Sequence, residues 1–126
     1  MELKKVETSK APAAIGPYSQ AIMCGDLVFT SGQIPLDAAT GEVVGSDVTT
    51  QANQVLLNLS EVLQAAGSCL DNVIKTTCFL ADMADFADFN KVYEGYLKTK
   101  PARSAVAVRE LPKGVLVEVE AVAKIG

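Results

Sequence analysis

A chain of 126 residues is the size of one domain, and we expect residues 1–126 to fold around one core. Its formal net charge of −4 argues against a protein that gains its affinity by neutralising nucleic-acid phosphates. The absence of histidine excludes Ser-His and Cys-His nucleophile pairs and histidine-ligated metals.

The first half of the chain has the pattern of three strands followed by one helix. Three short segments carry the strand pattern: 4–7, 17–24 and 26–31. From Val48 to Ala66 the apolar residues recur at steps of three and four, which predicts an amphipathic helix. Ser46 or Asp47 can cap its start, and Gly67 is suited to end it.

The second half alternates strand and helix. Strands are expected at 72–81, 103–109 and 115–125. An aromatic stripe from Phe86 to Leu97 predicts a second helix, which begins near Asp82 or Asp85 and ends before Pro101. The order β-β-β-α-β-α-β-β is typical of an α+β fold, with one mixed sheet of about six strands and two helices packed on one face.

The strands look apolar on both faces. Phe29 and Val28 point to opposite sides of one strand, as do Val106 and Ala107 of another. Two helices can cover only one face of such a sheet. We therefore expect a homo-oligomer packed through the other face.

Cysteine usage and the chain start indicate the compartment. Cys24, Cys69 and Cys78 form no CxxC pair, so neither a structural metal nor a disulfide framework is predicted. No signal peptide and no long apolar stretch is visible. We expect a cytoplasmic protein without a membrane segment.

Arg103 is the first candidate for function. It is one of two arginines and lies at the entry of an apolar strand, where a guanidinium taken partly out of water needs an anionic partner. That partner is either an internal carboxylate, with Glu118 and Glu120 as candidates if the last two strands pair, or the carboxylate of a ligand bound bidentately.

Two polar clusters lie at the ends of predicted strands, one beside a turn and one before a loop. Tyr18, in Gly-Pro-Tyr-Ser-Gln, is expected to open a strand. It is either an aromatic residue beside a turn or a residue whose hydroxyl donates a hydrogen bond in a pocket. Ser31 and Gly32, in Ser-Gly-Gln-Ile-Pro, either end a strand that needs glycine for its backbone angles or expose amides and a hydroxyl to an anion.

Two acids share one face of the last strand. Glu118 and Glu120 alternate with valine in Val-Glu-Val-Glu, an unfavourable arrangement unless each has a partner or a role. A carboxylate with a raised pKa here can accept a proton. Asn90, off the apolar stripe of the second helix, is most simply a solvent-exposed side chain.

These motifs together resemble the RidA family of imine deaminases, whose members were once described as translation inhibitors. The resemblance covers essentially the whole chain and rests on Ile-Gly-Pro-Tyr-Ser-Gln-Ala, Ser-Gly-Gln-Ile-Pro, Pro-Ala-Arg-Ser and Leu-Pro-Lys-Gly followed by Glu-Val-Glu-Ala-Val-Ala. It implies a chorismate-mutase-like fold and a homotrimer with its sites between subunits.

The implied activity is hydrolysis of 2-imino acids and their enamine tautomers, released by pyridoxal-phosphate-dependent dehydratases, to 2-keto acids and ammonia, without cofactor or metal. By the matching motifs, Arg103 binds the substrate carboxylate and Glu118 activates water. The cleft would be lined by Tyr18, Ser31, Gly32, Asn90 and Ala105.

The sequence departs from the family pattern at two positions, and two alternative functions remain. Ala105 stands where many members have cysteine, and Lys100 where an aromatic residue is common, so the preferred substrate side chain is open. The alternatives are a non-catalytic trimer that binds small carboxylates, and an RNA-cleaving translation inhibitor, against which the net charge and the lack of histidine count.

Overall fold

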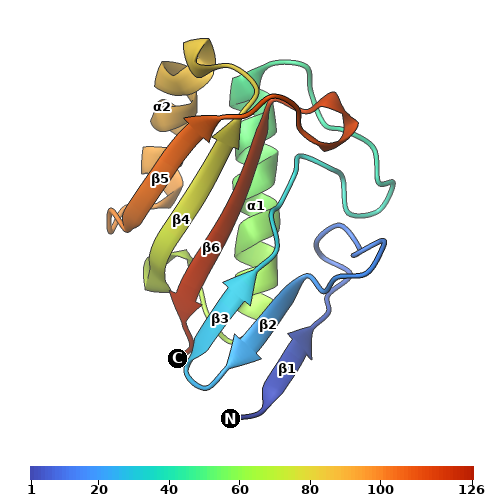
Figure 1. Cartoon of the computed structure of the whole chain (residues 1–126), viewed down its shortest axis with the longest axis vertical. Helices are drawn as coiled ribbons and strands as arrows, with labels where there is room; N and C mark the ends of the chain where they lie inside the picture. Colours follow the sequence, from blue (N-terminus) through green and yellow to red (C-terminus); the bar gives the residue numbers. More distant parts are fainter.

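One six-stranded sheet carries both helices on the same face (Figure 1). The computed structural model describes all residues, 1–126. The strands follow the order β1-β2-β3-β6-β4-β5 across the sheet. The elements are β1 (Leu3–Val6), β2 (Ala21–Cys24), β3 (Leu27–Thr30), α1 (Val48–Ala65), β4 (Val73–Leu80), α2 (Phe86–Tyr96), β5 (Ala102–Ala107) and β6 (Val117–Lys124). The predicted α+β fold and order of elements are confirmed.

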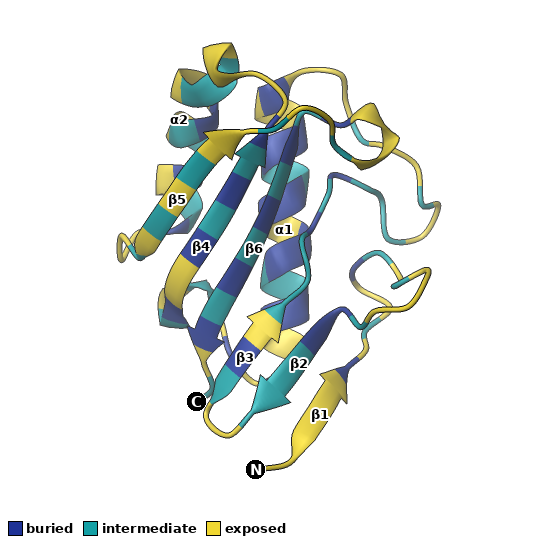
Figure 2. Ribbon diagram, in the orientation of Figure 1, coloured by how far each residue is buried: buried dark blue, intermediate teal, exposed yellow.

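Helix α1 has a capping side chain at its start and a glycine with positive φ after its end. The Asp47 carboxylate accepts a hydrogen bond of 2.8 Å from Thr50 N, and Gly67, with φ +79°, follows the last turn. Its apolar stripe, including the fully buried Val55 and Leu59, lies against the sheet (Figure 2). The predicted helix and its Asp47 cap are therefore confirmed.

Helix α2 is preceded by a 3-10 turn over Met83–Asp85. Asp82 starts that turn by accepting from Ala84 N at 2.8 Å. Phe89 and Tyr93 are buried within the helix and Leu97 just beyond it, so the aromatic stripe packs into the core as expected.

The expected pairing of the last two strands is wrong. β4 lies between them: it pairs parallel with β5, where Thr76 is opposite Arg103, and antiparallel with β6, where Phe79 is opposite Glu118. The reason is the α2 crossover, which returns the chain parallel to β4 on its outer side and leaves only the inner side for β6.

The second strand is shorter than predicted, because residues 17–20 are not part of it. Gly16 has φ +127°, and Tyr18 N donates to Gly16 O at 2.9 Å in a tight turn. Tyr18 therefore precedes β2 and does not open it. Pairing with β3 begins at Ala21.

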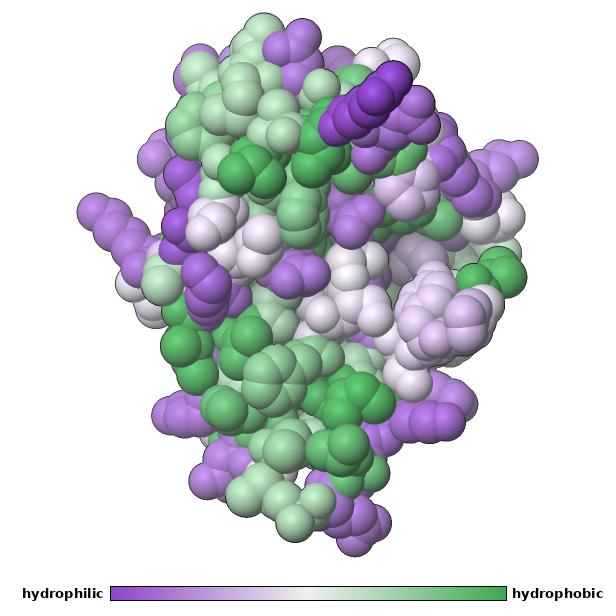
Figure 3. Space-filling view, in the orientation of Figure 1, coloured by the Kyte–Doolittle hydropathy of each residue, from purple (hydrophilic) through white to green (hydrophobic).

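The sheet face away from the helices is uncovered in the single chain. Val28 points toward the helices and is fully buried, whereas its neighbour Phe29 is 44% exposed and Val106 of β5 is 45% exposed. Apolar side chains gather over the lower part of this face (Figure 3). The chain has no helix with the length and apolarity needed to cross a membrane.

Candidate functional site

Arg103 lies under helix α2, on the face of the sheet that carries the helices. Its register partner on β4 is the buried Thr76, whose side chain points to the same face. The guanidinium carbon stands 5.3 Å from the ring centre of Phe86 and 4.8 Å from that of Tyr93. Both distances are those of cation–π contacts, so two rings hold the charge in place.

Asn90 completes this seat for the guanidinium. Nη1 of Arg103 donates a hydrogen bond of 2.7 Å to Asn90 Oδ1. Phe86, Asn90 and Tyr93 follow one another at steps of four and three, which places them on one face of α2. The expectation that Asn90 is simply solvent-exposed is wrong, and this spacing was the signal that could have shown it.

A buried hydroxyl pair fixes Tyr93 in turn. Its hydroxyl lies 2.7 Å from Thr76 Oγ1 in the core, and either oxygen can be the donor. Burial raises the pKa of Tyr93 above its ordinary value, which disfavours loss of the hydroxyl proton even further. From the sequence, Tyr93 is only one member of the aromatic stripe of the second helix.

No carboxylate of the chain pairs with Arg103. The one ion pair present joins Lys91 to Asp88 on the surface, at 3.9 Å. The hypothesis of an internal Glu118 or Glu120 partner is therefore wrong. A guanidinium has five N–H donors, and only one is engaged with the protein here. Arg103 opens into a shallow cavity of about 350 Å³ that Asn90 and Lys100 also line.

Glu118 belongs to a second, larger cavity of about 1080 Å³ on the other side of the sheet. Tyr18, Ser31, Gly32 and Glu120 line the same cavity. Burial, followed by the charge of Glu120, raises the pKa of the Glu118 carboxyl above its ordinary value. A carboxylate of this kind exchanges protons closer to neutral pH than a solvated one.

The backbone beside Glu118 offers a free donor. Ser31 N donates to Gln20 O at 2.9 Å and Gln33 N to Val119 O at 2.8 Å, but the N–H of Gly32 has no acceptor in the chain. The Ser31 hydroxyl itself donates to Ser19 O at 2.6 Å, which leaves its lone pairs for a ligand. The predicted Ser31-Gly32 pair is thus brought to the Glu118 cavity.

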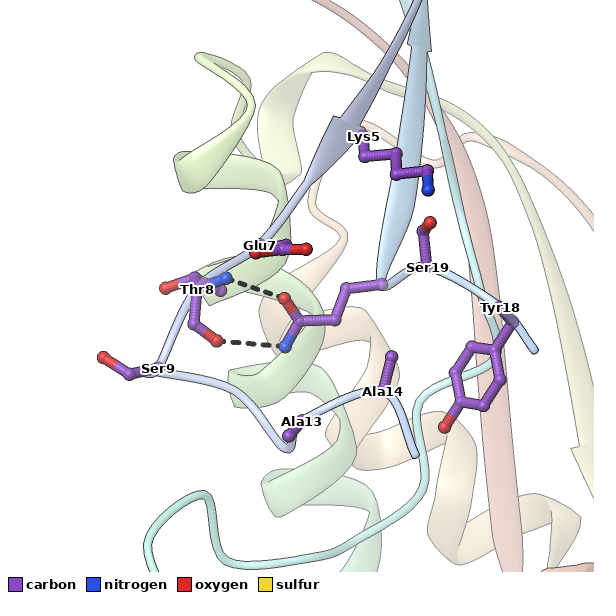
Figure 4. Close-up of a pocket in the computed structure, with 9 residues that line it drawn as sticks. Lys5, Glu7, Thr8, Ser9, Ala13, Ala14, Tyr18 and Ser19 are labelled. Atoms are coloured by element: carbon purple, nitrogen blue, oxygen red, sulfur yellow. Dashed lines mark hydrogen bonds between the residues drawn. The ribbon is translucent and has the colours of Figure 1, made fainter. Parts of the chain in front are cut away.

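Gln20, two residues after Tyr18, fixes the segment before β2, a role that the sequence analysis missed. The buried Gln20 side chain accepts from Thr8 N at 2.7 Å and donates to Thr8 O at 3.0 Å and to Pro12 O at 2.8 Å. Figure 4 shows Tyr18 among the residues that line a neighbouring cavity of about 440 Å³, together with Lys5 and Thr8. A polar residue at the start of a buried strand was the available signal.

Ala105 lies on the edge strand β5, half-buried and opposite Cys78 of β4. The Cys78 thiol is buried, and burial raises its pKa to about 11, so it is no replacement for a reactive thiol at position 105.

The expected site residues thus form two groups on opposite faces of the sheet, so they cannot line one site within a single chain. Arg103, Asn90 and Ala105 lie on β5 and α2 on the helix side of the sheet. Glu118 is opposite Phe79, whose side chain points to the open side, because residues 76 and 79 of β4 lie on opposite faces. A ligand that contacts both Arg103 and Glu118 therefore needs two copies of the chain.

The chain is therefore an α+β domain whose Arg103, without a carboxylate partner, and half-buried Glu118 lie on opposite faces of one sheet. The family described as Endoribonuclease L-PSP matches residues 8–125. The chain belongs to this family, which is the RidA family.

Relatives and solved structures agree along the whole chain. A RutC family protein of Pyrococcus horikoshii is 54% identical, over 92% of this chain and 93% of that protein. The 2-iminobutanoate/2-iminopropanoate deaminase of Mus musculus is 48% identical, over 98% and 92%. A Thermotoga maritima structure matches with a TM-score of 0.96 at 46% identity, covering 100% and 99%. Escherichia coli TdcF with bound serine matches with a TM-score of 0.92 at 44% identity, covering 98% and 99%.

Proposed function

We propose that this protein is a 2-iminobutanoate/2-iminopropanoate deaminase, which hydrolyses reactive imines and their enamine tautomers to 2-keto acids and ammonia. The observation that carries the proposal is Arg103, a guanidinium held by two rings and one amide with no carboxylate of its own. The name of the mouse relative and the serine bound to the E. coli relative support a small substrate with a carboxylate.

The reaction needs only modest catalysis, because a 2-imino acid is already electrophilic. Arg103 binds the carboxylate through two N–H groups and so orients the imine carbon. Glu118 accepts a proton from the attacking water, which adds to that carbon and forms a carbinolamine. Glu118 returns that proton to the imine nitrogen, which completes the carbinolamine. The carbinolamine hydroxyl proton then also passes to nitrogen, the C–O bond becomes a carbonyl as the C–N bond breaks, and ammonia and the keto acid leave.

The proposal includes a homotrimer with its sites between subunits, each site taking Arg103 from one copy and Glu118 from the next. It is supported by the opposite placement of these residues and by the exposed apolar residues of the open sheet face, such as Phe29. The free N–H of Gly32 would donate to the developing charge on the substrate. No metal or cofactor takes part in the proposed reaction.

The direct test generates 2-aminoacrylate or 2-aminocrotonate with a dehydratase and follows release of the keto acid. We expect faster release with the protein than without it. An unchanged rate would remove the proposal. Saturable binding of a keto acid without turnover would instead favour a trimer that only binds small carboxylates.

A mixing experiment tests whether the site is shared between chains. The variants Arg103→Ala and Glu118→Ala should each be inactive, but a site built from the intact Arg103 of one and the intact Glu118 of the other is complete. After co-refolding at equal amounts, three-quarters of randomly formed trimers contain both variants and each has one complete site in three, so about a quarter of wild-type activity should return. No recovery from trimers shown to be mixed would place both residues in one chain's site.

RNA cleavage is the less favoured alternative, although the matching family carries that description. A net charge of −4 and no histidine give the chain neither a phosphate-binding surface nor the usual base. Cleavage that survives removal of contaminating nuclease and is lost in Arg103→Ala would revive it.

A further inference from the structure

Gly32 lies directly against the carboxyl group of Glu118. A methyl group built on Gly32 would stand 2.7 Å from Glu118 Cδ and 3.0 Å from Cγ, with Oε2 nearer still. Carbon atoms that are not bonded approach to about 3.5–4.0 Å, so no side chain fits at position 32 while Glu118 keeps its place.

Backbone conformation does not explain this glycine. Gly16, Gly25, Gly41 and other glycines of the chain have positive φ, but Gly32 does not. The expectation that the strand end needs glycine for its backbone angles is therefore wrong. What the position needs is the missing Cβ.

The obstructing atoms also decide what a larger residue would do. They are the end of a flexible glutamate side chain, whereas the backbone of residue 33 is tied to β6 by Gln33 N to Val119 O at 2.8 Å and Val119 N to Gln33 O at 3.1 Å. A methyl group at position 32 should therefore displace the carboxyl and leave the fold intact.

We propose that Gly32 is a positioning residue. Because it has no side chain, it leaves the space, here called the seat, in which the Glu118 carboxyl is held within the larger cavity. The role of that seat in water activation rests on the proposed function, but the seat itself does not. The substitution Gly32→Ala separates the two properties of this residue, because it keeps the free N–H and removes only the space.

The matched control is Gly95→Ala. Gly95 lies in α2 without positive φ, and a Cβ built on it meets nothing within 4 Å. Alanine there should leave the site unchanged and stabilise the helix slightly.

The first readout is independent of activity: an NMR titration of the Glu118 carboxyl. In the wild type its pKa is raised by burial and by Glu120. In Gly32→Ala the displaced carboxyl enters water and its pKa should fall toward the ordinary value, while Gly95→Ala keeps the raised value. Both variants keep the other titratable residues that line the cavity, which are Tyr18, Lys113 and Glu120. An unchanged Glu118 pKa in Gly32→Ala would overturn the proposal.

The second readout is the rate. Displacement of a catalytic group by about 1 Å can cost roughly 100-fold, so Gly32→Ala should lower kcat about 10- to 100-fold and change KM much less. In a Glu118→Ala background the obstructing Cγ, Cδ and Oε2 atoms are absent, so adding Gly32→Ala should lower the residual rate little further. If the rate losses of the two substitutions were fully additive in the double variant, Gly32 would not act through Glu118. A wild type without deaminase activity would refute the proposed function, and the titration would still decide the role of Gly32.

Discussion

Arg103→Lys tests the carboxylate clamp with its charge conserved. Lysine offers a point charge without the planar fork, so it loses the 2.7 Å bond to Asn90 Oδ1 and one of two bonds to a ligand carboxylate. A lost hydrogen bond to a charged group costs about 1.5–3 kcal/mol. At about 1.4 kcal/mol per factor of ten, ligand affinity should fall roughly 10- to 150-fold.

Calorimetric titration with pyruvate, a product-like 2-keto acid, measures this loss directly. Arg109→Lys is the matched control, because Arg109 is the only other arginine and is exposed beyond the end of β5. We expect wild-type affinity in the control. Pyruvate binding by Arg103→Lys within about twofold of wild type, or an equal loss in Arg109→Lys, would refute the clamp.

Two further predictions concern stability. Because the folded-state pKa of Glu118 is raised, the folded chain holds more protons than the unfolded chain just above the ordinary carboxyl pKa, and the free energy of unfolding falls as pH rises through that window. Glu118→Gln should therefore be more stable than wild type at about pH 7 but not at about pH 3 in urea unfolding; lower stability at both would contradict the assignment. Tyr93→Phe leaves the Thr76 hydroxyl with only the Cys78 thiol, at 3.8 Å, and should cost about 1–3 kcal/mol. Tyr93→Phe combined with Thr76→Val should recover most of that cost, and a double variant as unstable as the single one would argue against the pair.

The elements could be predicted from the sequence because their signals are local. The step of three and four from Val48 to Ala66, with Asp47 before it and Gly67 after it, determines a helix whatever the rest of the chain does. The boundary that failed, residues 17–20, lies where Gly16 adopts positive φ and turns the backbone, which a strand pattern does not reveal.

The candidate residues were also found from the sequence, chiefly through motifs that the family shares. Their neighbours were not. The sequence places Phe86 in the aromatic stripe of the second helix and Asn90 in solvent, and it cannot show that both meet Arg103, because the face of α2 that meets Arg103 depends on how the helix docks. The same is true of Gly32, whose reason for being glycine is a side chain 86 positions away in the sequence.

By itself the sequence determined the order of helices and strands and the presence of an arginine without an obvious internal partner. Tertiary structure alone decided that β4 separates β5 from β6 and that Arg103 and Glu118 lie on opposite faces of the sheet. The physical reason is that alternation along a strand specifies which residues share a face, but the crossover of α2 and the register of three strands specify which face that is.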